Sequence, residues 1–127
     1  MITGIGTDIT DINRIEKLLN DRFITRCFTK AEQKYCESKR SGGGHIAAYA
    51  RRFAAKEATA KALGCGIGAK AGLLEIEITH DENGKPHLTL HGNAQKTLQS
   101  LGQAPTAHLS LSDEPPMALA FVIIETK

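Results

Sequence analysis

The chain has 127 residues, of which 41% are hydrophobic and 24% charged, and this predicts a single domain over residues 1–127 with a modest core. A formal net charge of +2 is too small to indicate nucleic-acid binding, and no apolar run approaches the roughly 18 residues of a membrane span. Three cysteines without CxxC spacing and an N-terminus unlike a signal peptide argue against a disulfide framework and predict a cytoplasmic protein with neither nucleic-acid nor membrane partners.

The first element predicted is a strand from Ile2 to Thr10, rich in Ile and Thr and interrupted by two glycines. With a period of two, Gly4, Gly6 and Asp8 share one face of it. The glycines are expected to leave open space around the Asp8 carboxylate, as the close approach of a backbone or a ligand would require. Asp8 therefore has two open interpretations, a functional carboxylate or a residue that only helps to begin the following helix.

The next helix is expected to begin at Thr10 as its N-cap and to leave Arg14 exposed. Basic residues clearly outnumber acidic residues between Arg14 and Arg52. This excess fits either an acidic or phosphate-rich partner or an ordinary solvated surface. Further along, Thr29 and Glu32 have the spacing of a capping box that opens a short helix.

The most informative stretch is a predicted helix from His45 to Leu63. At about 100° per residue its apolar residues Ile46, Tyr49, Ala50, Phe53 and Ala60 form one stripe. Glu57 lies near the centre of that stripe, and Lys61 lies at its edge one turn later. Because a buried carboxylate is costly unless it is paired or bound to a metal, Glu57 is predicted to belong to a functional site.

The second half of the chain is predicted to be mostly antiparallel sheet. A strand over residues 74–78, a turn at Asn83-Gly84 and a return strand form a hairpin, followed by a helix and two further strands, of which the last is almost entirely apolar. The glycines at 64, 66 and 68 follow a helix rather than a strand, which excludes a dinucleotide fingerprint. The element order predicts an α+β fold with a mostly antiparallel sheet packed against the long central helix.

Two carboxylates, Asp8 and Glu57, with Lys61 beside the second, are typical ligands for Mg²⁺ that also binds phosphate. Another Mg²⁺-dependent phosphoryl or nucleotidyl transferase remains an alternative, although the chain has no GxxxxGK[ST] loop. A non-catalytic basic module that binds RNA or an acidic protein is the alternative from a different class.

Several motifs together resemble those of the holo-acyl-carrier-protein synthase family of phosphopantetheinyl transferases. They are GIGTDI at 4–9, RFAAKEA at 52–58 and KALG at 61–64, with the FT, GIG, GKP and HLSLSD stretches in the family's order. The resemblance implies transfer of the 4'-phosphopantetheine arm of coenzyme A to a serine hydroxyl of apo-acyl carrier protein, releasing 3',5'-ADP, in support of fatty acid biosynthesis.

The resemblance also implies site residues. Asp8 and Glu57 would bind Mg²⁺, Lys61 would lie at the phosphates, and either Glu57 or a water that it orients would take the serine proton. His108 would lie near the reacting groups. The nucleotide-binding residues would be Arg52, Phe53 and Lys61 of the central helix, Gly64 and Gly66 of the loop after it, and His108.

For partners, the resemblance implies coenzyme A and an acidic acyl carrier protein. The basic excess then gains a purpose, and the expected contacts with the carrier are Arg14, Arg22 and Arg26. Members of the family form homotrimers with active sites between subunits, so a homotrimer is expected here.

Overall fold

The computed structural model describes all residues, 1–127, and gives an α+β fold. Its elements, in chain order, are β1 (Ile2–Asp11), α1 (Ile12–Leu18), α2 (Asp21–Cys27), α3 (Lys30–Glu37), the 3-10 helix η1 (Arg40–Gly42), α4 (His45–Leu63), the 3-10 helix η2 (Leu73–Glu75), β2 (Ile76–His80), β3 (Pro86–Leu90), α5 (Gly92–Gln99), β4 (Thr106–Glu114) and β5 (Met117–Glu125). The expected α+β class, with antiparallel sheets against a long central helix, is confirmed.

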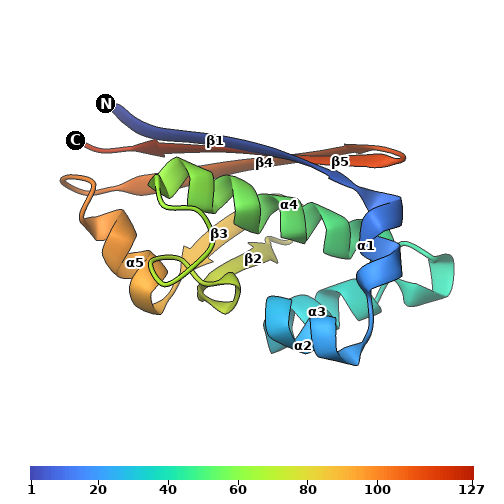
Figure 1. The fold of residues 1–127 in the computed structure, drawn as a ribbon. Helices are drawn as coiled ribbons and strands as arrows, with labels where there is room; N and C mark the ends of the chain where they lie inside the picture. Colours follow the sequence, from blue (N-terminus) through green and yellow to red (C-terminus); the bar gives the residue numbers. More distant parts are fainter.

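Two antiparallel sheets enclose the central helix. The larger has the strand order β1-β5-β4, and the smaller is the β2–β3 hairpin. Figure 1 shows the larger sheet as a layer along α4, while α1, α2 and α3 gather near the N-terminal end of that helix. The nearly all-apolar strand β5 is the central strand of the larger sheet. No helix combines the length and the apolar content that crossing a bilayer would require.

Helix α4 begins and ends where its sequence predicted, but it is buried on several faces rather than along one stripe. Ile46 and Phe53 of the predicted stripe are only half-buried, whereas Arg52 and Lys56, outside it, are fully buried. The helix contacts β1, β5 and β2. Its many alanines allow this close packing from more than one side, and this is why a single-stripe interpretation was too narrow.

Strand β1 approaches α4 most closely at its two glycines. A Cβ atom added to Gly4 or Gly6 would overlap a carbonyl oxygen of the helix, that of Ala62 or Ala58 respectively. The glycines therefore permit backbone-to-backbone packing. This is the close approach of a backbone that the glycines beside Asp8 were expected to permit.

Helix α1 begins one residue later than expected. Asp11, not Thr10, is the N-cap, and its side chain accepts a hydrogen bond of 2.9 Å from the backbone N–H of Asn13. Thr10 is still part of β1 and is buried, and its hydroxyl donates to the Asp8 carboxylate at 2.9 Å. The predicted capping box of Thr29 and Glu32 and the Gly64 C-cap are both present.

Candidate active site

Asp8 lies on the face of β1 that packs against α4. One of its carboxylate oxygens, Oδ1, lies 3.1 Å from the Lys61 ammonium, and the other accepts the hydrogen bond from Thr10. The Asp8 side chain keeps 17% of its surface exposed. The strand and the last turns of α4 together therefore hold a carboxylate and an ammonium at the surface.

Glu57 occupies the middle of α4 and is half-buried without a hydrogen-bond or ion-pair partner. Burial raises the pKa of its carboxyl, and the negative charge of Asp8 raises it further, while Lys61 and Arg14 act in the opposite direction. Asp8 pairs with Lys61, which lies one helical turn after Glu57, so the structure places the two predicted carboxylates at the same part of α4. Lys61 pairs with Asp8 rather than with Glu57.

The oxygen atoms of this site fit a hard divalent cation. Asp8 and Glu57 supply two carboxylates, and no cluster of three or more His, Cys, Asp or Glu side chains is present in the chain. Mg²⁺ is usually held by one or two carboxylates together with water and substrate phosphates. The unpartnered Glu57 carboxylate, half-buried next to a second negative charge, is the observation that favours a cation here.

Lys61 extends from the last turn of α4, and its side chain is 53% exposed. Its ammonium donates to Thr7 O at 2.9 Å and to Asp8 Oδ1, which leaves one N–H free. The chain then turns through Gly64 and Gly66, both in the left-handed region with φ of 85° and 69°. Added Cβ atoms there would meet nothing within 4 Å, so this loop is open to solvent.

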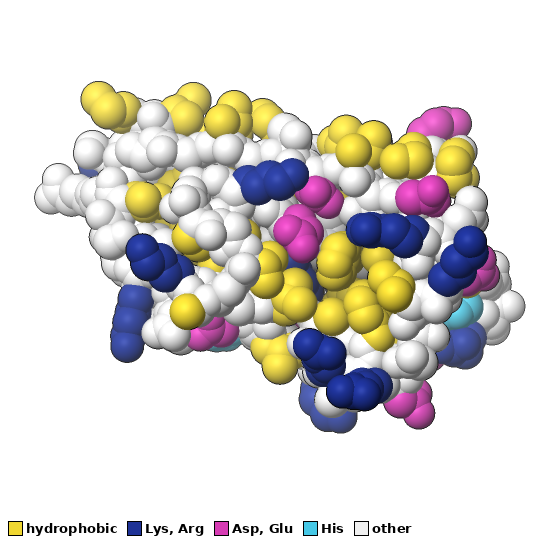
Figure 2. Space-filling model, in the orientation of Figure 1, with side chains coloured by type: hydrophobic (Ala, Val, Ile, Leu, Met, Phe, Trp, Pro, Cys, Tyr) yellow, Lys and Arg dark blue, Asp and Glu magenta, His cyan; other side chains and the backbone are white.

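A groove of about 570 Å³ lies beside this part of α4. Its walls come from α2, from η2 and from the loop after α4, and its lining includes Phe23, Cys27, Phe53, Ile67 and Leu73. Phe53 precedes Glu57 by one helical turn, so the groove and the carboxylates share one face of α4. Figure 2 shows acidic side chains on this face directly beside a group of hydrophobic side chains.

Arg52 does not reach the carboxylates. It is 1% exposed, stacks 4.0 Å from the centre of the Tyr35 ring, and one of its terminal nitrogens lies 2.9 Å from His80 Nδ1. It lies five positions before Glu57, a rotation of about 140° around the helix axis, which places it on a different side of α4. The structure therefore gives no support to its expected contact with the nucleotide, and the cause is the burial of its guanidinium.

His108 is also far from the two carboxylates within one chain. Along the sheet, His108 pairs with Ile123, whereas Asp8 and Leu111 both pair with Ala120. An offset of three residues along β5 places His108 on the opposite face of the sheet and about 14 Å from Asp8 between Cα atoms. Strand register turns His108 away from the carboxylates of its own chain, so its expected place near the reacting groups stays a prediction that requires a neighbouring subunit.

That opposite face of the larger sheet carries exposed apolar side chains. Ile5 and Ile9 are 60% and 62% exposed, and Leu119 joins them from β5. His108 lies on the same face, with Nε2 at 2.8 Å from Glu125 Oε1. A row of large apolar side chains in water is typical of a surface that another protein covers.

The three arginines expected to contact a partner are all exposed on the first two helices. Arg14 lies close enough to Glu57 to lower its pKa. Arg26 lines the groove, and Arg22 lies on the same short helix, α2. The structure therefore places Arg26 at the groove and Arg14 near Glu57, while Arg22 lies one turn before Arg26 on α2.

A buried ion pair escaped the sequence interpretation. Lys56 Nζ and Glu32 Oε1 are 2.8 Å apart, and both side chains are fully buried. Lys56 lies outside the predicted apolar stripe of the helix, so periodicity gave no sign that it is buried. Glu32 was explained as part of a capping box, which concealed its second role.

Comparison with known proteins identifies the family to which the sequence motifs pointed. Residues 4–120 match the model of the 4'-phosphopantetheinyl transferase superfamily. A holo-[acyl-carrier-protein] synthase from Methylorubrum extorquens (strain PA1) is 47% identical, with 98% of this chain and 94% of the relative covered.

Solved structures agree with the sequence relatives. A holo-[acyl-carrier-protein] synthase from Neisseria meningitidis is 38% identical, with a TM-score of 0.86 over 99% of this chain and all of the other. One from Bacillus anthracis, in complex with CoA (3',5'-ADP), is 38% identical, with a TM-score of 0.82 over 100% and 99% of the two chains. The chain belongs to the holo-[acyl-carrier-protein] synthase family of 4'-phosphopantetheinyl transferases.

Proposed function

We propose that the chain, as one domain over residues 1–127, transfers the 4'-phosphopantetheine arm of coenzyme A to a serine hydroxyl of apo-acyl carrier protein, releasing 3',5'-ADP. The observation that carries this function is the pair of neighbouring carboxylates, Asp8 and Glu57, beside Lys61 on a fold shared with this family. A cytoplasmic location and a role in fatty acid biosynthesis are further predictions.

Asp8 and Glu57 would hold Mg²⁺, which when bound neutralises negative charge on the substrate phosphates. The donor set supports this assignment, since Glu57 presents a carboxylate that no protein group engages. Lys61 has one N–H free to bind a phosphate oxygen of coenzyme A. This contact would stabilise the negative charge on the leaving 3',5'-ADP.

The Glu57 carboxylate is our candidate for the group that takes the serine proton. No protein group engages this carboxylate, so it is free to accept a proton, either directly or through a water that it orients. The groove beside it is lined by Phe53 and Leu73 and offers an apolar wall for the pantetheine arm. If coenzyme A binds with a phosphate at Lys61 and its pantetheine arm in the groove, the reacting phosphorus would lie next to Glu57.

The exposed arginines of α1 and α2 are proposed to bind the acidic carrier protein. Arg26 lines the groove, Arg22 lies one turn before it on α2, and Arg14 lies near Glu57, where the acceptor serine must arrive. Positive charge there would speed association and orient the carrier.

We further propose a homotrimer in which a neighbouring subunit supplies His108. The exposed isoleucines at 5 and 9 favour burial of the outer sheet face, and His108 shares that face. A complementation assay tests this arrangement: inactive His108→Ala and Glu57→Gln variants are unfolded together, refolded as a mixture and assayed. Recovered activity supports shared sites, and a mixture as inactive as its parts contradicts them.

The function itself is tested by mass spectrometry of apo-acyl carrier protein incubated with the protein and coenzyme A. We expect a mass gain equal to one phosphopantetheine, which disappears when a chelator removes Mg²⁺ and returns when Mg²⁺ is added in excess. No mass gain in the presence of Mg²⁺ would contradict the proposed transfer. A gain that survives complete chelation would contradict the metal assignment alone.

A further inference from the structure

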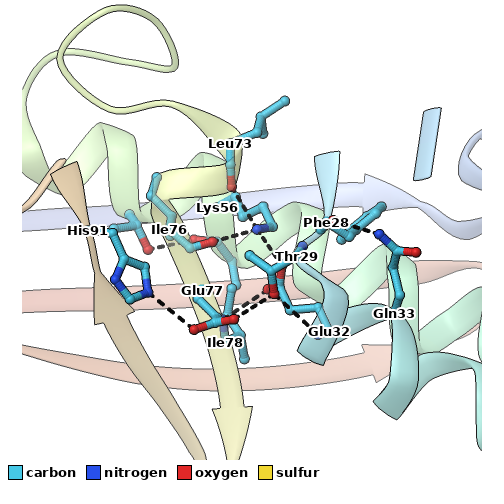
Figure 3. A network of polar contacts seen from close by, with 12 residues as sticks. Phe28, Thr29, Glu32, Gln33, Lys56, Leu73, Ile76, Glu77, Ile78 and His91 are labelled. Atoms are coloured by element: carbon cyan, nitrogen blue, oxygen red, sulfur yellow. Dashed lines mark hydrogen bonds and ion pairs between the residues drawn. The ribbon is translucent and has the colours of Figure 1, made fainter. Parts of the chain in front are cut away.

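The buried pair of Lys56 and Glu32 lies at the centre of a polar network behind the groove (Figure 3). Lys56 Nζ donates to Glu32 Oε1, to Leu73 O at 2.8 Å and to Ile76 O. All three of its N–H groups are therefore used inside the protein. Lys56 has no proton left for a substrate, although it is the residue immediately before Glu57.

Both carboxylate oxygens of Glu32 likewise have hydrogen-bond donors within the protein. Its Oε1 atom accepts from the backbone N–H of Thr29 as well as from Lys56, and its Oε2 atom accepts from the N–H of Ile78 at 2.9 Å. The pair thus satisfies backbone groups of three different segments. Thr29 continues the network, since its hydroxyl donates to Glu77 at 2.6 Å.

These contacts join two of the walls of the groove, those formed by α2 and by η2. Leu73, whose carbonyl binds Lys56, is a lining residue of the wall formed by η2. Thr29, held by Glu32, begins α3 two residues after Cys27, a lining residue of the wall formed by α2. Lys56 itself belongs to α4, which forms the floor at Phe53. One ion pair therefore connects α2, η2 and α4, three of the elements that line the groove.

The need to fill the core does not by itself explain why charged residues occupy these two positions. Burying two charges costs solvation, and apolar residues often replace such pairs without loss of stability. Here the charges have a further task, because removing them would leave four backbone groups without these partners: Ile76 and Ile78, which are buried, and Thr29 and Leu73, which are half-buried. The pair fixes where these backbone segments lie relative to α4.

We infer that Lys56 and Glu32 are positioning residues that set the separation of the groove walls and thereby the binding of the pantetheine arm of coenzyme A. This inference rests on the proposed function, since it takes coenzyme A as the substrate in the groove. Neither residue touches the reacting atoms. Their effect reaches the reaction through Leu73 and Cys27, which line the groove, and through the α4 backbone that continues into Glu57.

Comparing the binding of coenzyme A and of 3',5'-ADP distinguishes an effect on the pantetheine arm from a general distortion of the site. Both carry the nucleotide, but only coenzyme A has an arm that enters the groove. We expect Lys56→Met and Glu32→Gln to weaken coenzyme A binding about tenfold or more while 3',5'-ADP binding changes less than about twofold. Isothermal titration of each variant in the presence of Mg²⁺ measures both affinities.

The matched control is Lys96→Met, which removes an exposed lysine of α5 outside the groove and should change neither affinity. Equal weakening of both ligands by the pair variants would overturn the inference, because it would indicate a general distortion. Unchanged coenzyme A binding in a folded variant would overturn it as well. If Lys56→Met does not fold, Glu32→Gln decides, since the Gln side chain keeps a carbonyl acceptor for Ile78.

The wild-type protein keeps the two proposals distinguishable. If it binds coenzyme A but transfers nothing to apo-acyl carrier protein, the proposed function fails while the positioning role stands on the affinities. If it transfers normally and the pair variants keep both affinities, only the positioning role fails.

Discussion

Replacing Gly6 with alanine would test the close packing of β1 on α4 that brings Asp8 to Glu57. The added Cβ atom would overlap the Ala58 carbonyl oxygen and lie 2.8 Å from the Ala62 nitrogen, where ordinary contacts begin at 3.4 Å. Both neighbours are helix backbone, so no flexible side chain can move aside. The strand and the helix must separate instead.

The cost follows from the size of that separation. Relieving the overlap requires a shift of about 1 Å, and overpacking a well-packed interior costs about 1–3 kcal/mol. Because rigid backbone must move, we expect the upper end, about 3 kcal/mol. For a chain of this length that loss corresponds to a decrease in Tm of about 10 °C. The same shift moves Asp8 relative to Glu57, and a misplacement of this size can lower the transfer rate about 100-fold.

Thermal unfolding and steady-state transfer to apo-acyl carrier protein measure the two effects. Gly42→Ala is the matched control, because a Cβ atom added there meets nothing within 4 Å. It should leave both Tm and transfer near the wild-type values. A Gly6→Ala protein with a Tm within about 2 °C of wild type and with full activity would refute the reasoning.

Three further predictions concern the site and its surroundings. Glu57→Gln should lower transfer about 10³-fold with little change in Tm, because the carboxylate has no protein partner to lose; a variant as active as wild type would remove Glu57 from the mechanism. Arg14→Glu should raise the KM for the carrier protein about tenfold and change that for coenzyme A little; a larger effect on coenzyme A would mean that Arg14 acts through Glu57. Burial and the nearby Arg52 guanidinium lower the pKa of His80 from 6.5 to about 4, so the unfolded chain takes up a proton that the folded chain does not as pH falls through this window. Stability is therefore lost between pH 6.5 and 4, by about 1 kcal/mol after allowance for solvent screening, and His80→Gln should flatten the Tm profile there; an unchanged slope would contradict the assignment.

Local features of the fold could be predicted from the sequence because their causes are local. Helix α4 has the expected bounds, His45 to Leu63, since glycines flank both of its ends. The Thr29 capping box and the hairpin turn before β3 depend on residues only a few positions apart. The N-cap at Asp11 was missed because β1 continues past Thr10, and this extension depends on pairing with β5 at the other end of the chain.

Only part of the candidate site could be predicted from the sequence pattern. Periodicity singled out Glu57, since it needs nothing beyond the helix itself. The nearness of Asp8 depends on how β1 packs on α4, which Gly4 and Gly6 permit but do not specify. The resemblance to a family supplied that pairing. It also suggested His108, whose distance from Asp8 within one chain follows from a strand register that no local pattern encodes.

The contrast between Lys56 and Glu57 explains why helix periodicity alone gives an incomplete account. Both are charged residues on a helix that is buried on several sides, and their positions are adjacent. Lys56 has an acceptor within the protein for every N–H group, so its charge is used to hold the fold together. Glu57 has no protein partner and carries a raised pKa, so its charge is free for a ligand. A sequence shows which charges lie in apolar surroundings, but only the placement of α3 and η2 decides which of the two is structural and which is functional.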